Sequence, residues 1–229
     1  MYYDKNRRYF ENKKTAFFIG LGLLLAAFIL FVMPATLDNY RIISILVIPT
    51  LIAGCVLFFG SMMRRSSEAE IDEDVEKELE GFEDAVHRRF DLYDKELPYI
   101  STAVMERYHY YDTPYIRRDR QGEYRTDHYM KNVIYFTSDG LCAASRTVHL
   151  TDEGTDDAFY DISYKDITDV KLEENSKTYN IGKKEVTIHF YEFNIYGSDG
   201  ILFSCQTKRD YAVECAVEDI KTLAEKSRK

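Results

Sequence analysis

The stretch NVIYFTSDGLC (132–142) decides the fold of the C-terminal part of this 229-residue chain. Its first residues alternate with a period of two, so Ile134 and Phe136 share one face of a β-strand. The Ser-Asp-Gly at 138–140 marks a tight turn, because Asp-Gly readily adopts the backbone that a short hairpin needs. We therefore predict a strand, a hairpin turn and a return strand over 141–150.

The alternation continues downstream of this hairpin and predicts further short antiparallel strands. A second Asp-Gly hairpin is expected at 197–200. A turn region is expected at 175–182, and the chain becomes an amphipathic helix over 208–226. The predicted strands of this region cover 158–163, 167–172, 186–195 and 201–205.

The stretches 104–111 and 115–129 supply one or two more strands upstream. The C-terminal part therefore holds about seven short antiparallel strands and one helix, a number typical of small barrels and sandwiches. A helix in this position commonly covers the open end of such a barrel. We expect an antiparallel β-barrel or bent sandwich that is closed by a C-terminal helix.

This part of the chain resembles the bacterial pleckstrin-homology-like (PH-like) family, which includes membrane proteins with a transmembrane hairpin beside that domain. The segments that carry the likeness are NVIYFTSDGLC (132–142), DISYKDITDVKL (161–172) and EFNIYGSDGILFSCQTKRDYAVECAVEDIKTL (192–223), and the likeness covers residues 100–225. The resemblance implies a PH-like fold. In eukaryotic relatives of this fold, the loop between the first two strands binds phosphoinositides.

Two long apolar stretches near the N-terminus, 15–33 and 42–63, carry no charged side chain. A helix needs about 20 apolar residues to cross roughly 30 Å of hydrocarbon. A signal peptide is the rival for the first stretch, but its apolar core is longer than such a peptide needs and a second stretch follows closely. We predict two transmembrane helices in the lipid bilayer, with Gly22 and Ala26 spaced to let two helices approach.

The basic residues that flank these stretches predict their orientation. Five Lys and Arg precede the first stretch and two follow the second, whereas the connector at 34–41 holds only Arg41. Lys and Arg stay on the cytoplasmic side of a membrane. Both termini are therefore expected in the cytoplasm, as in a multi-pass protein of the cell membrane.

Residues 66–97 form a strongly acidic segment, with 13 acidic and 4 basic side chains. Apolar residues recur every three or four positions from Ile71 to Leu97, which predicts one amphipathic helix that Pro98 ends. Its narrow apolar stripe either packs on the following domain or pairs with a second copy of the chain. We expect this helix to act as a stalk.

The sequence carries no motif for a reaction or a metal site. Its formal charge of −9 argues against a nucleic-acid partner, which normally requires a basic surface. The five histidines are scattered singly, the four cysteines form no C-x-x-C pair, and no Gly-rich phosphate loop occurs. We therefore predict no catalytic residues, no bound metal and no cofactor.

The best candidate for a binding surface is PYIRRDRQGEYRTDHYMK (114–131), where cations and tyrosines interleave. Guanidinium groups grip phosphate through paired hydrogen bonds, and tyrosine rings stack or donate. The interspersed acids Asp119, Glu123 and Asp127 leave the alternative that the arginines are neutralised on a solvated strand pair. The predicted ligand-binding residues are Arg117, Arg118, Arg120, Arg125, Lys131, Tyr115 and Tyr124.

The expected architecture is α+β, with a two-helix transmembrane hairpin at 1–65, an acidic linker helix at 66–97 and a PH-like cytoplasmic β domain at 98–229. The first functional hypothesis is a membrane-anchored, non-catalytic binding or scaffolding module for a protein partner. The second is a ligand-gated membrane effector or sensor. Its β domain would bind a phosphorylated small molecule, and its hairpins would associate into a homo-oligomer.

Overall fold

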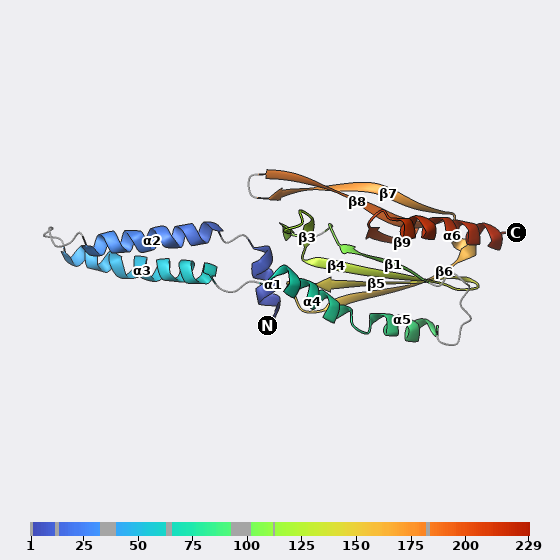
Figure 1. The fold of residues 1–229 in the computed structure, drawn as a ribbon, viewed down its shortest axis with the longest axis horizontal. Coiled ribbons are helices and arrows are strands. Elements are labelled where there is room, and N and C mark those ends of the chain that lie inside the picture. Colours follow the sequence, from blue (N-terminus) through green and yellow to red (C-terminus); the bar gives the residue numbers. More distant parts are fainter. Residues whose placement is uncertain are drawn as a thin grey trace. The chain divides into compact units, whose positions relative to one another are not determined.

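A computed structural model of the chain describes residues 2–11, 14–32, 40–62, 66–92, 102–111, 113–181 and 184–229. The chain divides into two compact units, Met1–Ser67 and Glu68–Lys229. The first unit is helical, and the second is an α+β unit dominated by antiparallel sheet (Figure 1).

Two helices of the first unit pack closely on each other through glycine. The ring of Phe17 lies 5.1 Å from that of Phe58, and a Cβ on Gly20 would lie only 2.6 Å from the backbone nitrogen of Phe58. Gly22, which the sequence favours as a contact point, has no atom within 4 Å of the place of a Cβ. The helices of this unit are α1 Tyr2–Phe10, α2 Lys14–Val32 and α3 Tyr40–Met62.

The two apolar stretches lie largely in α2 and α3. A helix needs about 20 apolar residues to cross a hydrocarbon core of roughly 30 Å. Within the described residues, no helix combines the necessary length and apolarity. This finding overturns the predicted transmembrane helices at 15–33 and 42–63, and with them the multi-pass location in the cell membrane. Most of the connector at 34–41 lies outside the described residues.

The strands of the second unit form two main sheets and one small hairpin. The first sheet has the order β1-β4-β5-β6 and the second the order β7-β8-β9, while β2 and β3 pair only with each other. All pairs are antiparallel. The strands are β1 Thr102–Tyr108, β2 Ile116–Arg118, β3 Tyr124–Thr126, β4 His128–Phe136, β5 Gly140–His149, β6 Thr155–Ser163, β7 Asp169–Ile181, β8 Lys184–Gly197 and β9 Gly200–Thr207.

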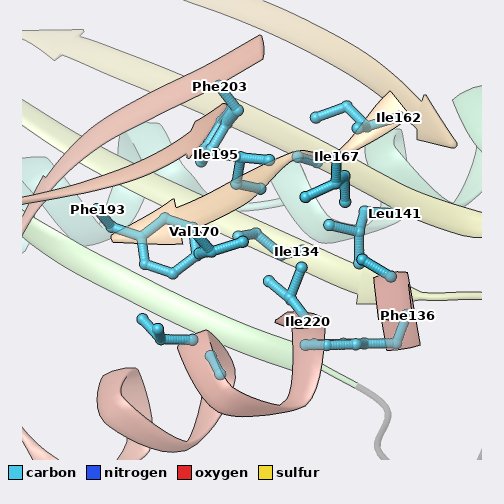
Figure 2. Packing of buried hydrophobic residues seen from close by; sticks show 14 of the residues in the cluster. Ile134, Phe136, Leu141, Ile162, Ile167, Val170, Phe193, Ile195, Phe203 and Ile220 are labelled. Atoms are coloured by element: carbon cyan, nitrogen blue, oxygen red, sulfur yellow. The ribbon is translucent and has the colours of Figure 1, made fainter. Parts of the chain in front are cut away.

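The main core lies between the two sheets and under α6, which spans Tyr211–Ser227. Ile134 and Phe136 of β4 face Phe193 and Ile195 of β8 across this core, and Ile220 of α6 covers it (Figure 2). All of these side chains are essentially inaccessible to water, and such burial is the main favourable term in folding. The shared face predicted for Ile134 and Phe136 is therefore confirmed.

A second core lies on the opposite face of the four-stranded sheet, beneath α4 Glu68–Leu79 and α5 Phe82–Phe90 (Figure 1). Phe82 and Val86 of α5 pack on Val133 and Tyr135 of β4 in this second core. Since side chains alternate along a strand, β4 is buried on both faces.

The segment 66–97 is not a free-standing stalk. Gly81 adopts the left-handed conformation, with φ of 72°, and ends the first helix after Leu79. Phe82 and Val86 of α5 pack on the sheet and α4 lies beside β5, as the packing alternative predicts. Residues 93–97 of the predicted helix lie outside the described residues.

Both predicted Asp-Gly hairpins are confirmed, but the turn region predicted at 175–182 is wrong for 175–181, which belong to a strand, while residue 182 lies outside the described residues. Strand β7 continues to Ile181 and pairs with β8 over its whole length. The hairpin persists because side chains near its tip, including Tyr179 and Val186, pack against Tyr110 from a distant part of the chain. The strand propensity of residues 175–181 alone therefore does not predict that they form a strand.

We expect Phe82→Ala to lower the free energy of unfolding by about 3–5 kcal/mol, because it empties a fully buried position under the sheet. Asp84→Ala, at an exposed position of the same helix, is the control and should change it by no more than about 0.5 kcal/mol. Urea unfolding followed by circular dichroism measures both. Equal effects in the two variants would show that α5 does not hold the sheet.

Candidate functional site

The structure divides the predicted ligand-binding residues between two faces. Arg117 pairs with Arg125 across the β2–β3 hairpin, and Arg118 pairs with Tyr124. Residues that face each other across antiparallel strands point to the same side. The two pairs therefore point to opposite sides, and Lys131 lies on a different sheet, in β4.

Two half-buried cations of this set, Arg125 and Lys131, are paired with the protein's own carboxylates. Arg125 contacts Asp72 at 2.5 Å and Asp119 at 3.1 Å. Burial lowers the pKa of Arg125, but these carboxylates outweigh burial and raise it above its ordinary value. Lys131 contacts Glu83 at 2.8 Å and Glu106 at 3.1 Å. The charges of Arg125 and Lys131 are therefore neutralised by neighbouring carboxylates, as the alternative to ligand binding predicts.

The other predicted residues lie on or beside the hairpin. Arg118 is exposed, donates from Nε to the carbonyl oxygen of Gly122 at 2.9 Å and lies over the ring of Tyr124. Arg120 is exposed in the turn, while Tyr115 and Arg117 are half-buried. The structure does not bring all seven residues to one cavity.

A different cavity lies beside this hairpin, and we call it the edge pocket. It has a volume of about 440 Å³ and collects residues from elements far apart in the sequence. Of the predicted residues, only Tyr124 lines it; Arg125 and Lys131 bond to its walls through Asp72 and Glu106. Its lining residues are Asp72, Glu106, Arg107, Tyr108, Tyr110, Glu123, Tyr124, Tyr129, Thr187, Ile188, His189 and Lys208.

The edge pocket follows the edges of two strands, one from each main sheet. Residues 106–108 of β1 and residues 187–189 of β8 all line it. Since consecutive strand residues point to opposite faces, a cavity that touches three in a row must lie along the strand edge. β1 is the outer strand of its sheet.

The backbone of β1 offers hydrogen-bonding groups to this cavity. The N–H of His109 donates to the carbonyl of His128 on β4, whereas the N–H of Tyr110 donates outward to the side chain of Gln206. Backbone direction alternates along a strand. Glu106 and Tyr108 therefore share the outward direction of Tyr110.

The edge of β8 is open because β9 is shorter than β8. The ladder between them begins at the pair Tyr191–Thr207, and in the described chain no strand pairs with this edge of β8 over 184–190. Lys208, the residue that follows β9, lines the pocket. The pocket thus occupies the space that a longer β9 would fill.

The walls of the pocket combine tyrosine rings with charged groups. The hydroxyl of Tyr110 donates to the carbonyl of Tyr124 at 2.9 Å, and that of Tyr129 donates to Glu106 at 3.3 Å. Burial raises the pKa of both phenols, and the Glu106 carboxylate adds to the rise at Tyr129. The rings therefore remain neutral donors at physiological pH.

A second cluster lies at the end of the β4–β5 ladder where His128 pairs with His149. The rings of His128 and His149 lie 4.7 Å apart, and Nε2 of His149 lies 2.8 Å from Asp156. Asp127, nearly inaccessible, accepts hydrogen bonds from Thr113 and Thr151. Among the residues with described positions, no group of three or more His, Cys, Asp or Glu side chains has the geometry to hold a metal ion.

Comparison with known proteins gives no relative for this chain. No family model, no curated protein and no solved structure matches it.

Sequence reasoning missed most of the edge pocket, including Arg107 and the β8 residues 187–189. One signal was present: the strand predicted at 186–195 is longer than its hairpin partner at 201–205. Unequal hairpin strands leave one edge unpaired. Which residues of β1 approach that edge depends on how the two sheets pack.

Arg125→Met should lower the free energy of unfolding by about 1–3 kcal/mol, because it leaves Asp72 and Asp119 without their shared cation in a half-buried setting. Arg120→Met removes an exposed charge from the same hairpin and should change stability by about 0.5 kcal/mol or less. Thermal and urea unfolding measure both. A stability for Arg125→Met equal to that of the wild type would contradict the bridging role.

The free energy of unfolding should fall as the pH drops from 7.5 to 5.5, and His128→Gln should reduce this fall. Burial lowers the pKa of His128, although the nearby Asp127 carboxylate opposes it. The unfolded chain takes up a proton near the ordinary histidine pKa of about 6.5, while the folded chain does so only at lower pH. Urea unfolding at the two pH values measures the difference. An equally steep fall in the variant would contradict this assignment.

Proposed function

We propose that the chain is a non-catalytic binding module whose edge pocket takes an extended segment of a protein partner. The observation that carries this proposal is the open edge of β8 over 184–190, beside a cavity that continues the line of β9. The segment would pair with β8 as β9 does and lie beside β1.

The physical basis is the unsatisfied backbone of an open strand edge. An exposed edge presents rows of N–H and C=O groups, and a peptide in strand conformation satisfies them. Tyrosine side chains supply large contact areas at low cost in conformational entropy, so they suit a protein interface. The pocket offers both features: the β8 edge, and Tyr108, Tyr110, Tyr124 and Tyr129.

We further propose that this module is PH-like. The order of elements in the second unit supports this proposal: a four-stranded antiparallel sheet, a three-stranded antiparallel sheet and a terminal helix. This is the order that the family resemblance implies. The β2–β3 hairpin would then be an insertion between the first two strands of the four-stranded sheet.

A phosphorylated ligand on the predicted cationic residues is the weaker alternative. Arg125 and Lys131 each contact two carboxylates, and a phosphate would have to displace them. Anion binding needs cations whose charge is not already compensated. No described contact favours that site over the edge pocket.

The proposal is tested with random dodecapeptides displayed against the full chain, followed by fluorescence anisotropy on the selected peptides. We expect methylation of single backbone nitrogens to weaken binding at alternate positions, because alternate residues of a strand face the same neighbour. Peptides that bind equally well with any single nitrogen methylated would rule out strand pairing. Failure to select any peptide would count against the proposal as a whole.

A matched pair of variants locates the binding site on the chain. Thr187 and Thr178 face each other across β8 and β7 and share a hydrogen bond, but only Thr187 lines the pocket. Thr187→Trp places a bulky ring at the pocket and should weaken peptide binding at least tenfold. Thr178→Trp should bind like the wild type. Sedimentation of the free chain detects the rival arrangement, in which two copies pair through this edge.

A further inference from the structure

Arg107 stands in the wall of the edge pocket without a carboxylate partner. Its Nη1 donates to the carbonyl oxygen of Thr207 at 2.7 Å, and its guanidinium lies 5.2 Å from the ring centre of Tyr110. Its Nε is buried and has no hydrogen-bond acceptor in the described part of the chain. No ion pair of Arg107 exists among the described residues.

The other cations around this pocket are paired. Lys131 and Arg125 each contact two carboxylates, and Lys208 lies 3.6 Å from Glu123. Among the described residues, half-buried Arg107 is therefore distinguished from these neighbours by having no carboxylate partner, since its guanidinium contacts the Thr207 carbonyl and the Tyr110 side chain instead. Charges removed from water are costly unless a counter-charge or hydrogen bonds replace the lost hydration.

A second unsatisfied donor lies beside Arg107. Gln206 is nearly inaccessible, and its Nε2 has no acceptor in the residues that the structure describes, while its Oε1 accepts from the N–H of Tyr110. Gln206 precedes Thr207, which accepts from Arg107. Arg107 Nε and Gln206 Nε2 are both donors without an acceptor among the described residues, so the group that would complete either of them is an acceptor.

We infer that the bound segment presents one carboxylate, from an internal Asp or Glu side chain, to Arg107. This inference rests on the function proposed above and names the chemistry of the partner. A guanidinium binds a carboxylate through two parallel hydrogen bonds, which supplies the acceptors that Arg107 lacks.

The position of Arg107 favours a side chain over a chain terminus. The pocket extends along β1 on both sides of Arg107, from Glu106 to Tyr108, so a segment that ended there would leave part of the edge uncovered. The carboxylates of Asp72, Glu106 and Glu123 also line the pocket and repel additional acids. The site therefore selects a single acidic residue with neutral or basic neighbours, and not an acidic run.

The test is a double-mutant cycle on the dodecapeptides selected against the full chain. Replacing the acidic residue of a peptide by its amide, Glu by Gln or Asp by Asn, should weaken binding to the wild type at least tenfold, as expected for a desolvated charge pair. The same replacement should have no effect on binding to Arg107→Met. Arg107→Lys should retain part of the difference, because it keeps the charge but loses the paired geometry.

Two controls separate this inference from the function on which it rests. Arg89→Met removes an exposed cation of α5 that does not line the pocket, and it should leave the acid-to-amide difference at the wild-type value. Melting temperatures show whether Arg107→Met folds, and if it does not, the acid-to-amide difference and its salt dependence on the wild type still decide the question. Strand-like binding by peptides without an acid preference would overturn the role of Arg107 alone. Absence of any peptide binding would overturn both proposals.

Discussion

The packing of α4 and α5 on the outer face of the four-stranded sheet is the interaction on which the rest of the second unit depends. Phe82 and Val86 are fully buried against β4 and β5, while the other face of the same strands forms the main core. A sheet buried on both faces has no solvent side, so β4 is nearly apolar throughout its second half. The helices thereby become part of the domain.

The same packing explains where the charges of the linker helices go. Glu106, Lys131, Arg146 and Asp157 lie in cross-strand register over all four strands, and they face the helices. Lys131 pairs with Glu83 of α5, and Arg146 donates to the carbonyl of Glu78 in α4. A highly acidic helix pair is thus held on a sheet whose central strands supply the cations. The edge pocket lies at the end of this row, where Glu106 meets Tyr129.

The open edge follows from a mismatch in strand length. β7 and β8 extend far beyond β9, and the tip of their hairpin is stabilised by Tyr108, Tyr110 and Tyr111. An isolated two-stranded hairpin is only marginally stable in water. The tyrosine contacts keep the hairpin ordered without pairing its second edge. A rigid but unpaired edge suits a strand-binding site, because a strand that is already ordered loses little conformational entropy when a partner binds.

Much of the second unit was predictable from local pattern. The two Asp-Gly hairpins, the alternation through 132–142 and the C-terminal helix depend on period and turn chemistry, which act between neighbouring residues. Asp210 caps that helix by accepting from the N–H of Val213, a signal equally local. The prediction of membrane-spanning helices also relied on a local pattern, the apolar content of each stretch. Among the described residues, no helix is long and apolar enough to cross a membrane.

The edge pocket depends on contacts between residues that lie far apart in the sequence. Arg107 and Thr207 are a hundred residues apart, yet their hydrogen bond marks the end of β9 and one wall of the pocket. The sequence determined which residues form strands and that the 114–131 cations are interspersed with acids. Only the tertiary structure decided which carboxylates neutralise Arg125 and Lys131, and that Arg107 has no carboxylate partner among the described residues. Charge pairing follows distance in space and solvent exclusion, not order along the chain.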